Sequence, residues 1–393
     1  MRLARGRAAP PERAVSAARV LATLAGYALV VGGTVELGPQ ADTPVPGLGV
    51  ALVAAGLLSW VLVWRRRRSG GRAVAVTAAL LAVLTGLAVA VALVPPDLPA
   101  SAAASGLSNA QSARTPGEPE PTGYLTASDG TKLAYFADIP ADPVATLVFY
   151  HGSGANAGAG YLDFGRQLAA RYGIATYLFD MRGHGRSGGR RGDAPSPRRM
   201  FADTQAAVAF VKRAHPALPE FAGGHSAGAG LVLNSEDRIA RDLAGYVYLA
   251  PDFGLHSGTE RRSGAANFVT LSHRVLIADV LSNGLLDAHT YAVSFAYTQE
   301  EIDRAGLVSR YTPAMALAQD AGDSATVLAR TPQPVGVWIG ADDEVFDAAK
   351  VTAWAAHAPL ATTGVVAATD HLGIIDRSVD TVGPWLVSHA TAG

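Results

Sequence analysis

The sequence predicts an α/β domain, built on a mostly parallel sheet with helices on both faces, preceded by three membrane-spanning helices. Two observations in the 393 residues favour this fold. Between residues 122 and 393, short and fully apolar segments alternate with helical segments, which is typical of a parallel sheet covered on both faces. Before residue 95, three long apolar runs contain no charged side chain.

The three apolar runs cover residues 20–35, 47–64 and 73–94. A bilayer core needs roughly 20 apolar residues per helix, so residues 1–95 are expected to form a membrane region with three spans. Arginines precede the first run and cluster between the second and third, whereas the loop after the first run holds only acidic charges. The positive-inside rule places the N-terminus in the cytoplasm of a multi-pass membrane protein, and everything after Val94 outside. If the first run did not span, this orientation would reverse.

Residues 96–121 are rich in proline, alanine and serine, and this composition predicts a semi-extended linker that holds the next domain away from the bilayer. The domain at 122–393 begins with a hairpin around Ser128, Asp129 and Gly130, because this turn sequence separates two strand-like segments. Later strands are expected at 145–150, 174–179, 221–225, 243–250, 334–339 and 363–368, and helices at 161–172, 198–213, 227–234, 348–357 and 380–389.

One stretch, at about 251–331, interrupts the alternation and is too long for a simple crossover between two parallel strands. Its apolar residues have helical spacing over 268–286, and residues 298–303 combine a turn with acidic side chains, as the start of a helix does. These patterns predict an inserted, mostly helical lid.

Composition excludes several classes of function. The net charge is −1, so no overall field favours nucleic acid as a partner. The chain has no cysteine, which rules out disulfides, cysteine–zinc sites and thiol catalysis. No metal or cofactor is expected, and the sequence leaves the oligomeric state open.

The most informative motif is Gly224-His225-Ser226-Ala227-Gly228. It has the G-x-S-x-G pattern of a nucleophile elbow, a tight strand-to-helix turn that exposes a serine. Glycines are needed because the serine backbone is strained and crowded by its neighbours. Ser226 is therefore the candidate nucleophile.

A serine nucleophile needs a base, and histidine has a suitable pKa. His371 follows the last predicted strand, at the sheet edge where the elbow also emerges. The histidine in turn needs an acid, and three adjacent carboxylates follow the strand at 334–339. The sequence does not rank Asp342, Asp343 and Glu344 geometrically; Asp343 is our choice, and Asp252 is a more distant option. The order Ser226, Asp343, His371 matches the chain order of an α/β-hydrolase triad.

Stabilising the oxyanion of the reaction requires two backbone N–H groups. Ala227 supplies one, because it follows the nucleophile at a helix N-terminus. The glycine-rich segment His151-Gly152-Ser153-Gly154 follows the strand at 145–150, and the Ser153 N–H is the expected second donor. Such a donor contributes about 3 kcal/mol to transition-state stabilisation.

Taken together, residues from about 122 to 390 resemble the α/β-hydrolase superfamily, and within it the monoacylglycerol lipase and lysophospholipase group. The resemblance implies an α/β-hydrolase fold with a lid, and it supports Asp343 as acid and Ser153 and Ala227 as oxyanion donors. The elbow departs from the group, which more often has a bulkier residue followed by two glycines where this chain has Ala227-Gly228-Ala229. The matching segments are 151–154, 180–187, 224–228, 340–343 and His371.

A second glycine pattern, G-x-G-x-x-G at 183–188, is interpreted as a loop rather than as a dinucleotide site. A dinucleotide site needs a helix that opens directly after the glycines, whereas residues 189–197 continue as a proline-containing loop. His184 is accordingly expected to be a loop or packing residue.

The sequence thus predicts a membrane-anchored serine ester hydrolase whose substrate is lipid-like, such as a monoacylglycerol or lysophospholipid. Alternatives within the fold are a short-chain carboxylesterase, a thioesterase and an aminopeptidase, and outside enzymes a catalytically silent, membrane-tethered scaffold. An aminopeptidase would need acidic groups for the substrate amine, for which the lid offers Glu300, Glu301 and Asp303. The residues expected to contact substrate are His151, Phe268, Tyr291 and Phe295.

Overall fold

A computed structural model describes residues 98–99, 119–261, 268–282 and 288–390. The three predicted membrane spans and most of the linker lie outside these residues. Among the described helices, none is both long enough and apolar enough to cross a bilayer. The central sheet and the site belong to the compact unit formed by Pro95–Leu276 and Asp287–Gly393, and residues Ile277–Leu286 cluster separately.

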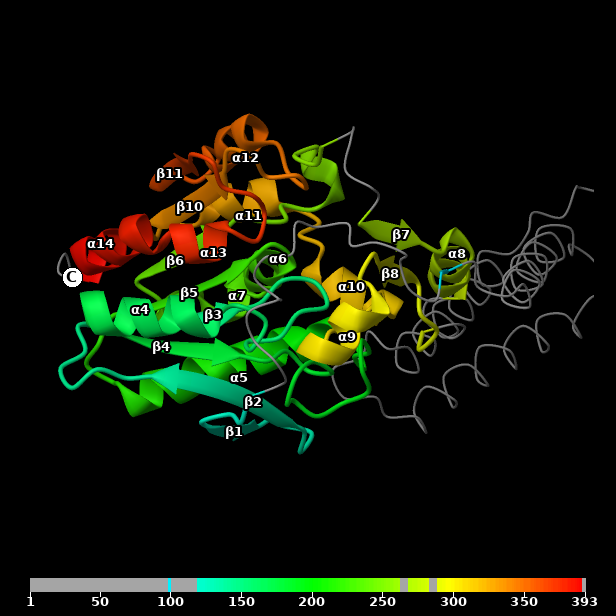
Figure 1. Cartoon of the computed structure of the whole chain (residues 1–393), viewed down its shortest axis with the longest axis horizontal. Coiled ribbons are helices and arrows are strands. Elements are labelled where there is room, and N and C mark those ends of the chain that lie inside the picture. Colours follow the sequence, from blue (N-terminus) through cyan, green and yellow to red (C-terminus); the bar gives the residue numbers. More distant parts are fainter. Residues whose placement is uncertain (1–97, 100–118, 262–267, 283–287, 391–393) are drawn as a thin grey trace, which may run out of the picture. The chain divides into compact units, whose positions relative to one another are not determined.

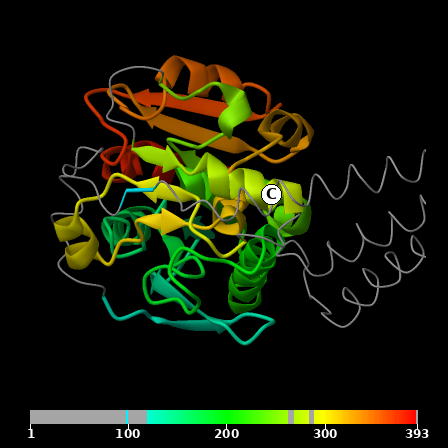
Figure 2. The same cartoon turned by 90° about the vertical axis from the view of Figure 1, so that its right-hand side faces the viewer.

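An eight-stranded sheet organises this unit, in the order β1-β2-β4-β3-β5-β6-β10-β11. The first three strands in this order pair antiparallel, and every later pairing is parallel. Figure 2 shows the two ends of the sheet, β1–β2 in cyan and β10–β11 in orange, on opposite sides of the unit. The strands are β1 Gly123–Thr126, β2 Lys132–Asp138, β3 Ala145–Tyr150, β4 Ile174–Phe179, β5 Glu220–His225, β6 Gly245–Leu249, β10 Val335–Gly340 and β11 Ala361–Val366.

Helices cover both faces of the sheet, as the apolar strands predict (Figure 1). On β4, Leu178 faces Gly165 of α4, whereas Phe179 faces Met200 of α5 across a small cavity. Successive strand side chains point to opposite faces, so α4 and α5 lie on different sides. The helices and shorter turns of this framework are α4 Leu162–Tyr172, α5 Pro197–Ala214, α6 Ala227–Asn234, α7 Glu236–Ile239, η1 Ala240–Asp242, α11 Ser324–Arg330, α12 Ala348–Ala355, α13 Ile374–Arg377 and α14 Val379–Ala390.

The burial of each strand agrees with its apolar sequence and its position in the sheet. Strands β3, β4, β5, β6 and β10 are buried at every position, which is the expected consequence of helices on both faces. The edge strand β11 is half-exposed along its length. This matches its position, since an edge strand has only one hydrogen-bonded neighbour.

The expected mostly helical lid is only partly correct. The insertion at 251–331 contains helices, but it also contains a three-stranded antiparallel sheet, β7-β8-β9, that the helical spacing over 268–286 did not predict. Phe268, directly before β7, stacks on Phe295 of β8, with ring centroids 5.6 Å apart. This contact favours pairing between the two strands. The elements are η2 Leu255–Ser257, β7 Val269–Leu271, α8 His273–Ser282, β8 Val293–Phe295, α9 Gln299–Ala305, β9 Arg310–Tyr311 and α10 Pro313–Gln319.

Candidate active site

Ser226 occupies the turn between β5 and α6, with φ 54° and ψ −122°. A positive φ is uncommon for a residue with a side chain and indicates local strain. Two hydrogen bonds hold the strained residue: its N–H donates to the Leu249 carbonyl at 2.9 Å, and its carbonyl accepts from the Asp252 N–H at 3.0 Å. The neighbouring strand therefore fixes the backbone of the elbow, and the side chain stands at the carboxyl edge of the sheet.

The elbow needs its two glycines for steric reasons. A Cβ on Gly224 would collide with the backbone of Gly228, and a Cβ on Gly228 would collide with the carbonyl groups of Tyr150 and His151. This backbone cannot move away readily, because Gly228 belongs to α6 and Tyr150 is the last residue of the central strand β3. The G-x-S-x-G pattern is thus explained by packing in this structure.

His371 and Asp343 lie together at the same edge. Nδ1 of His371 is 2.9 Å from Oδ2 of Asp343, and both residues are buried. The other oxygen of Asp343 accepts hydrogen bonds from the N–H groups of Val345 and Phe346, at 2.8 and 2.7 Å. The carboxylate is consequently fixed by its own loop and oriented toward the histidine.

The other carboxylates considered from sequence have different positions. Asp342 is exposed. Glu344 accepts a hydrogen bond from the main-chain N–H of His371 at 2.9 Å, so it holds the backbone rather than the ring. Asp252 lies beyond β6, where its Oδ1 accepts from the Gly254 N–H at 2.8 Å.

Electrostatics couple the pair. Burial alone would lower the pKa of His371, but the charge and hydrogen bond of Asp343 outweigh burial and raise the pKa above the ordinary value. Burial would likewise raise the pKa of Asp343, but His371 and the two N–H donors lower it. Asp343 is therefore an ionised partner that stabilises a protonated His371.

His225 connects the elbow to His371. Its Nε2 lies 2.9 Å from the His371 carbonyl oxygen, and its Nδ1 lies 2.8 Å from the Tyr161 hydroxyl. A carbonyl only accepts, so Nε2 carries the proton and Nδ1 accepts from the tyrosine. Burial lowers the pKa of His225 to about 3, so the ring stays neutral. His225, the residue before Ser226, thus links the elbow to the main chain of His371.

The two expected oxyanion donors, Ser153 and Ala227, line one cavity of about 340 Å³. Within the described residues, neither N–H donates to a protein acceptor. The cavity walls combine apolar side chains with three carboxylates, which the sequence did not identify as a group. The apolar residues are Leu255, Val269, Leu271, Leu276, Val293, Phe295 and Leu317, and the acidic residues are Asp252, Glu260 and Asp320.

Burial, reinforced by the negative charges of Asp320 and Glu260, raises the pKa of Asp252 to about 7. Asp320 also accepts a hydrogen bond from the Leu255 N–H at 3.0 Å. The insertion at 251–331 therefore contributes both acidic and apolar side chains to the cavity lining. The only sequence signal for Asp252 was its position after β6. No sequence signal indicated Glu260 or Asp320.

The four residues predicted to contact substrate differ in their positions relative to the cavity. Phe295 lines the cavity, and Phe268 stacks behind it. Tyr291 is not among the lining residues; its hydroxyl donates to the Arg191 carbonyl at 2.9 Å. His151 is buried beneath the glycine-rich loop, where Nε2 accepts from the Met181 N–H and Nδ1 donates to the Gly152 carbonyl.

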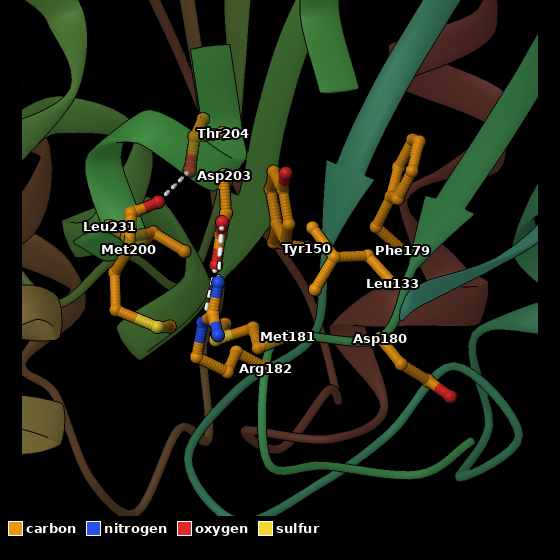
Figure 3. Close-up of a pocket in the computed structure, with 10 residues that line it drawn as sticks. All are labelled: Leu133, Tyr150, Phe179, Asp180, Met181, Arg182, Met200, Asp203, Thr204 and Leu231. Carbon is orange, nitrogen blue, oxygen red and sulfur yellow. Dashed lines mark hydrogen bonds and ion pairs between the residues drawn. The ribbon is translucent and has the colours of Figure 1, made fainter. Parts of the chain in front are cut away.

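The second glycine pattern forms a loop, as expected, because α5 starts only at Pro197. Arg182 anchors this loop through two hydrogen bonds to Asp203 of α5, at 2.8 and 2.9 Å. Figure 3 shows this pair beside a cavity of about 10 Å³, which is the size of one water molecule. These residues support the edge of the sheet and leave no space for a nucleotide.

The family model Hydrolase_4, described as serine aminopeptidase, S33, matches residues 141–370, which is more than half of the chain. A monoacylglycerol lipase of Mycolicibacterium smegmatis is 32% identical over 130 residues, which are 33% of this chain and 46% of that protein. A putative monoglyceride lipase of Schizosaccharomyces pombe is 33% identical over 159 residues, which are 39% of this chain and 40% of that protein. Each match thus spans less than half of the relative's length.

Among solved structures, Est1E of Butyrivibrio proteoclasticus with bound ferulic acid superposes with a TM-score of 0.51 and 16% identity, over 68% of this chain and 98% of that chain. A soluble variant of the monoglyceride lipase of Saccharomyces cerevisiae, in complex with a substrate analogue, gives a TM-score of 0.50 and 17% identity, over 71% and 97%. At these identities the likeness concerns the fold, and it confirms the predicted α/β-hydrolase architecture.

Proposed function

The chain belongs to the Hydrolase_4 family (serine aminopeptidase, S33), and we propose that it is a serine hydrolase that cleaves carboxylic esters. The observation that carries this proposal is the 2.9 Å contact between His371 and the buried Asp343, at the sheet edge where the strained Ser226 emerges. A paired, buried histidine beside an elbow serine has the chemistry required for acyl transfer.

In the proposed reaction, the Ser226 hydroxyl attacks the ester carbonyl carbon while Nε2 of His371 accepts the hydroxyl proton. Asp343 keeps the proton on Nδ1 and stabilises the imidazolium that forms. The tetrahedral intermediate collapses, the proton passes from Nε2 to the leaving alcohol, and an acyl-enzyme on Ser226 remains. A water molecule, deprotonated by His371, then releases the carboxylic acid and restores the serine.

The N–H groups of Ser153 and Ala227 are the proposed oxyanion donors. Two features support this role: both residues line the same cavity, and neither N–H is used by a protein acceptor among the described residues. Ala227 is also the first residue of α6, so the positive end of the helix dipole favours negative charge there.

The proposed substrate is a lipid-like ester such as a monoacylglycerol or lysophospholipid. Apolar side chains of the insertion line the cavity, and a volume of about 340 Å³ lies within the range of ligand sites. Two curated relatives are named as monoacylglycerol or monoglyceride lipases, which favours the same class. A short-chain carboxylesterase and a thioesterase would use the same chemistry with a different acyl donor.

A second candidate, release of an N-terminal residue from a peptide, is favoured by one observation. Asp252, Glu260 and Asp320 line the cavity that holds the proposed oxyanion donors. An ammonium group is attracted to such a wall. These residues, rather than the lid acids expected from sequence, would hold the substrate amine.

The two candidates are separated by a substrate panel tested on the full chain and on Ser226→Ala. The panel contains p-nitrophenyl esters of increasing acyl length, monoacylglycerols, an acyl thioester and aminoacyl p-nitroanilides. We expect Ser226-dependent turnover that rises with acyl length. Turnover of short esters, thioesters or anilides alone would replace the lipid proposal by the corresponding alternative. A Ser226→Ala variant with full turnover would contradict the proposed serine chemistry. A folded wild type without any turnover would favour the silent scaffold.

We also propose that the three apolar runs at 20–35, 47–64 and 73–94 anchor the enzyme in the cell membrane, with the hydrolase domain outside. The support is the sequence pattern alone. Because the chain lacks cysteine, single introduced cysteines report topology cleanly. In intact cells, a membrane-impermeant maleimide should label Ala141→Cys and spare Ser69→Cys. The opposite pattern would reverse the orientation, and protein that alkaline carbonate extracts would contradict the anchor.

A further inference from the structure

The peptide group between Ser153 and Gly154 is held at both ends by tyrosines of the insertion. The Tyr297 hydroxyl donates to the Ser153 carbonyl at 2.7 Å, and the Tyr311 hydroxyl accepts from the Gly154 N–H at 2.6 Å. Both tyrosines are almost fully buried, so water does not replace either hydrogen bond readily. This peptide group directly follows the proposed oxyanion donor.

The preceding peptide group, between Gly152 and Ser153, is held by residues of its own loop. The Gly152 carbonyl accepts from the Ala155 N–H at 3.2 Å and from His151 Nδ1 at 2.9 Å. In a trans peptide the carbonyl and the N–H of the same plane point in opposite directions. The Ser153 N–H therefore points away from these donors, and Ser153 lines the cavity. Its direction depends on both planes that meet at the Ser153 Cα.

A third contact joins the insertion to the same loop. The Val308 N–H donates to the Gly154 carbonyl at 2.7 Å. Gly154 has φ +68°, and a Cβ there would collide with the Val308 carbonyl. The backbone of the insertion thus approaches the loop as closely as a glycine allows.

A buried histidine fixes the Tyr311 hydroxyl. His184 Nδ1 lies 3.0 Å from the Arg182 carbonyl, so Nδ1 carries the proton and Nε2 accepts from the Tyr311 hydroxyl at 2.7 Å. The 2.7 Å contact to His184 is much shorter than the 3.5 Å contact to Gln319 Oε1, so the hydroxyl hydrogen is directed at His184 and the oxygen lone pairs are left for the Gly154 N–H. The loop histidine therefore determines which way the tyrosine bonds.

From these contacts we propose that Tyr297 and Tyr311 are positioning residues for the oxyanion hole. The insertion does not only cover the cavity: by holding both ends of the 153–154 peptide group, it sets the direction of the Ser153 N–H toward the tetrahedral intermediate. This inference rests on the proposed function of Ser226 and Ser153. Neither tyrosine hydroxyl touches the reacting atoms; each acts through the backbone.

The test compares Tyr311→Phe and Tyr297→Phe with Tyr177→Phe in the full chain. Tyr177 is a matched control, because its buried side chain also pairs with a histidine, His215 Nε2, at 2.8 Å and lies outside this loop. The measurements are kcat and KM for an ester, the melting temperature, and the rate constant for Ser226 labelling by a fluorophosphonate. Labelling requires the nucleophile and the oxyanion hole but no carboxylic ester.

Removal of an oxyanion donor lowers kcat by about 10²- to 10³-fold, so a misdirected donor should cost less. We expect Tyr311→Phe and Tyr297→Phe each to lower kcat and the labelling rate about 10- to 50-fold, with KM near wild type and melting temperatures near that of Tyr177→Phe. Because the two hydroxyls hold one peptide group, the double variant should lose less than the product of the single effects.

Labelling and turnover of both single variants within about twofold of Tyr177→Phe would overturn the inference while leaving the proposed function intact. A wild type that neither turns over nor labels at Ser226 would overturn both. Should Tyr311→Phe fail to fold, Tyr297→Phe decides by the same criteria.

Discussion

Asp343 and His371 meet at the ends of two neighbouring parallel strands, with Oδ2 of the aspartate 2.9 Å from Nδ1 of the histidine. β10 and β11 pair in register as far as Gly340 and Val366, and the Asp342 N–H donates to the Thr369 carbonyl at 3.0 Å. The sheet thus places two loops side by side and brings together residues that are 28 positions apart. The geometry of the pair is a consequence of strand register.

Replacing Asp343 by asparagine should lower kcat about 10³- to 10⁴-fold, because an amide neither holds the required tautomer nor stabilises the imidazolium. The Asn side chain keeps the shape and can still accept from Val345 and Phe346, so the fold should persist. Steady-state kinetics with a p-nitrophenyl ester and a melting curve measure the two effects separately.

The neighbouring carboxylates supply the controls for this substitution. Asp342→Asn should be within about twofold of wild type, because Asp342 is exposed and exposed substitutions are usually small in effect. Glu344→Gln should lose about 3- to 10-fold, since it weakens a main-chain hydrogen bond of His371 and removes a charge that helps to raise the pKa of His371. An Asp342 variant as impaired as the Asp343 variant would refute the assignment of the acid.

The pH dependence of kcat/KM should have an acidic limb set by His371. The base must be neutral to accept the serine proton, and the paired Asp343 raises the pKa of His371 above its ordinary value. Activity is therefore present above that pKa and falls as the pH drops through it. In Asp343→Asn the residual activity should show a limb at lower pH, because burial of His371 then acts without the carboxylate. Limbs at the same pH in both proteins would contradict the electrostatic coupling.

The sequence was sufficient for the elements and loops that carry chemistry. Apolar strands, alternation with helices and the elbow glycines are local signals, and the structure has the elbow, the acid loop and the His371 loop at one edge of the sheet. In a parallel sheet, the loops that follow the carboxyl ends of the strands lie at one edge. Residue type and chain position were therefore enough to predict that Ser226, Asp343 and His371 lie at the same edge of the sheet.

The structural features that the sequence did not predict depend on contacts between segments that are distant in the chain. Strand β8 is three residues long and pairs only because the insertion folds back on itself, so no local pattern predicts it. The same applies to Glu260 and Asp320, which face one cavity from separate loops. His151 was predicted as a substrate contact, and its ring nitrogens bond with the Gly152 carbonyl and the Met181 N–H, which no sequence pattern indicated.

Gly154→Ala should damage both stability and catalysis, in contrast to Gly130→Ala. Both glycines have positive φ, 68° and 85°, but a Cβ on Gly130 would meet nothing within 4 Å. Gly130→Ala should therefore cost about 1 kcal/mol of backbone strain with unchanged kcat. Gly154→Ala adds a collision with the Val308 carbonyl, and we expect a loss of about 2–4 kcal/mol and at least tenfold lower kcat. Urea unfolding and ester kinetics check both; equal effects of the two substitutions would contradict the close approach.

Glu220, at the start of β5, should make stability depend on pH. The residue is 1% exposed, and neither carboxyl oxygen has a hydrogen-bond partner among the described residues. Burial raises the pKa of Glu220 to about 8, although the charge of Lys212 opposes the shift. The unfolded chain ionises this group near its ordinary pKa, whereas the folded chain keeps the proton until about pH 8.

The sign of the effect follows from this difference. The folded state binds the proton more tightly, so its advantage is complete below the unfolded pKa and is lost as the pH rises toward 8. Between pH 5 and pH 8, the free energy of unfolding of the wild type should therefore fall about 1–3 kcal/mol more than that of Glu220→Gln. The exposed Asp142→Asn serves as control and should keep the wild-type slope. If the free energy of unfolding of wild type and Glu220→Gln changed in parallel with pH, the pKa of Glu220 would be the same in the folded and unfolded states, which would contradict this prediction.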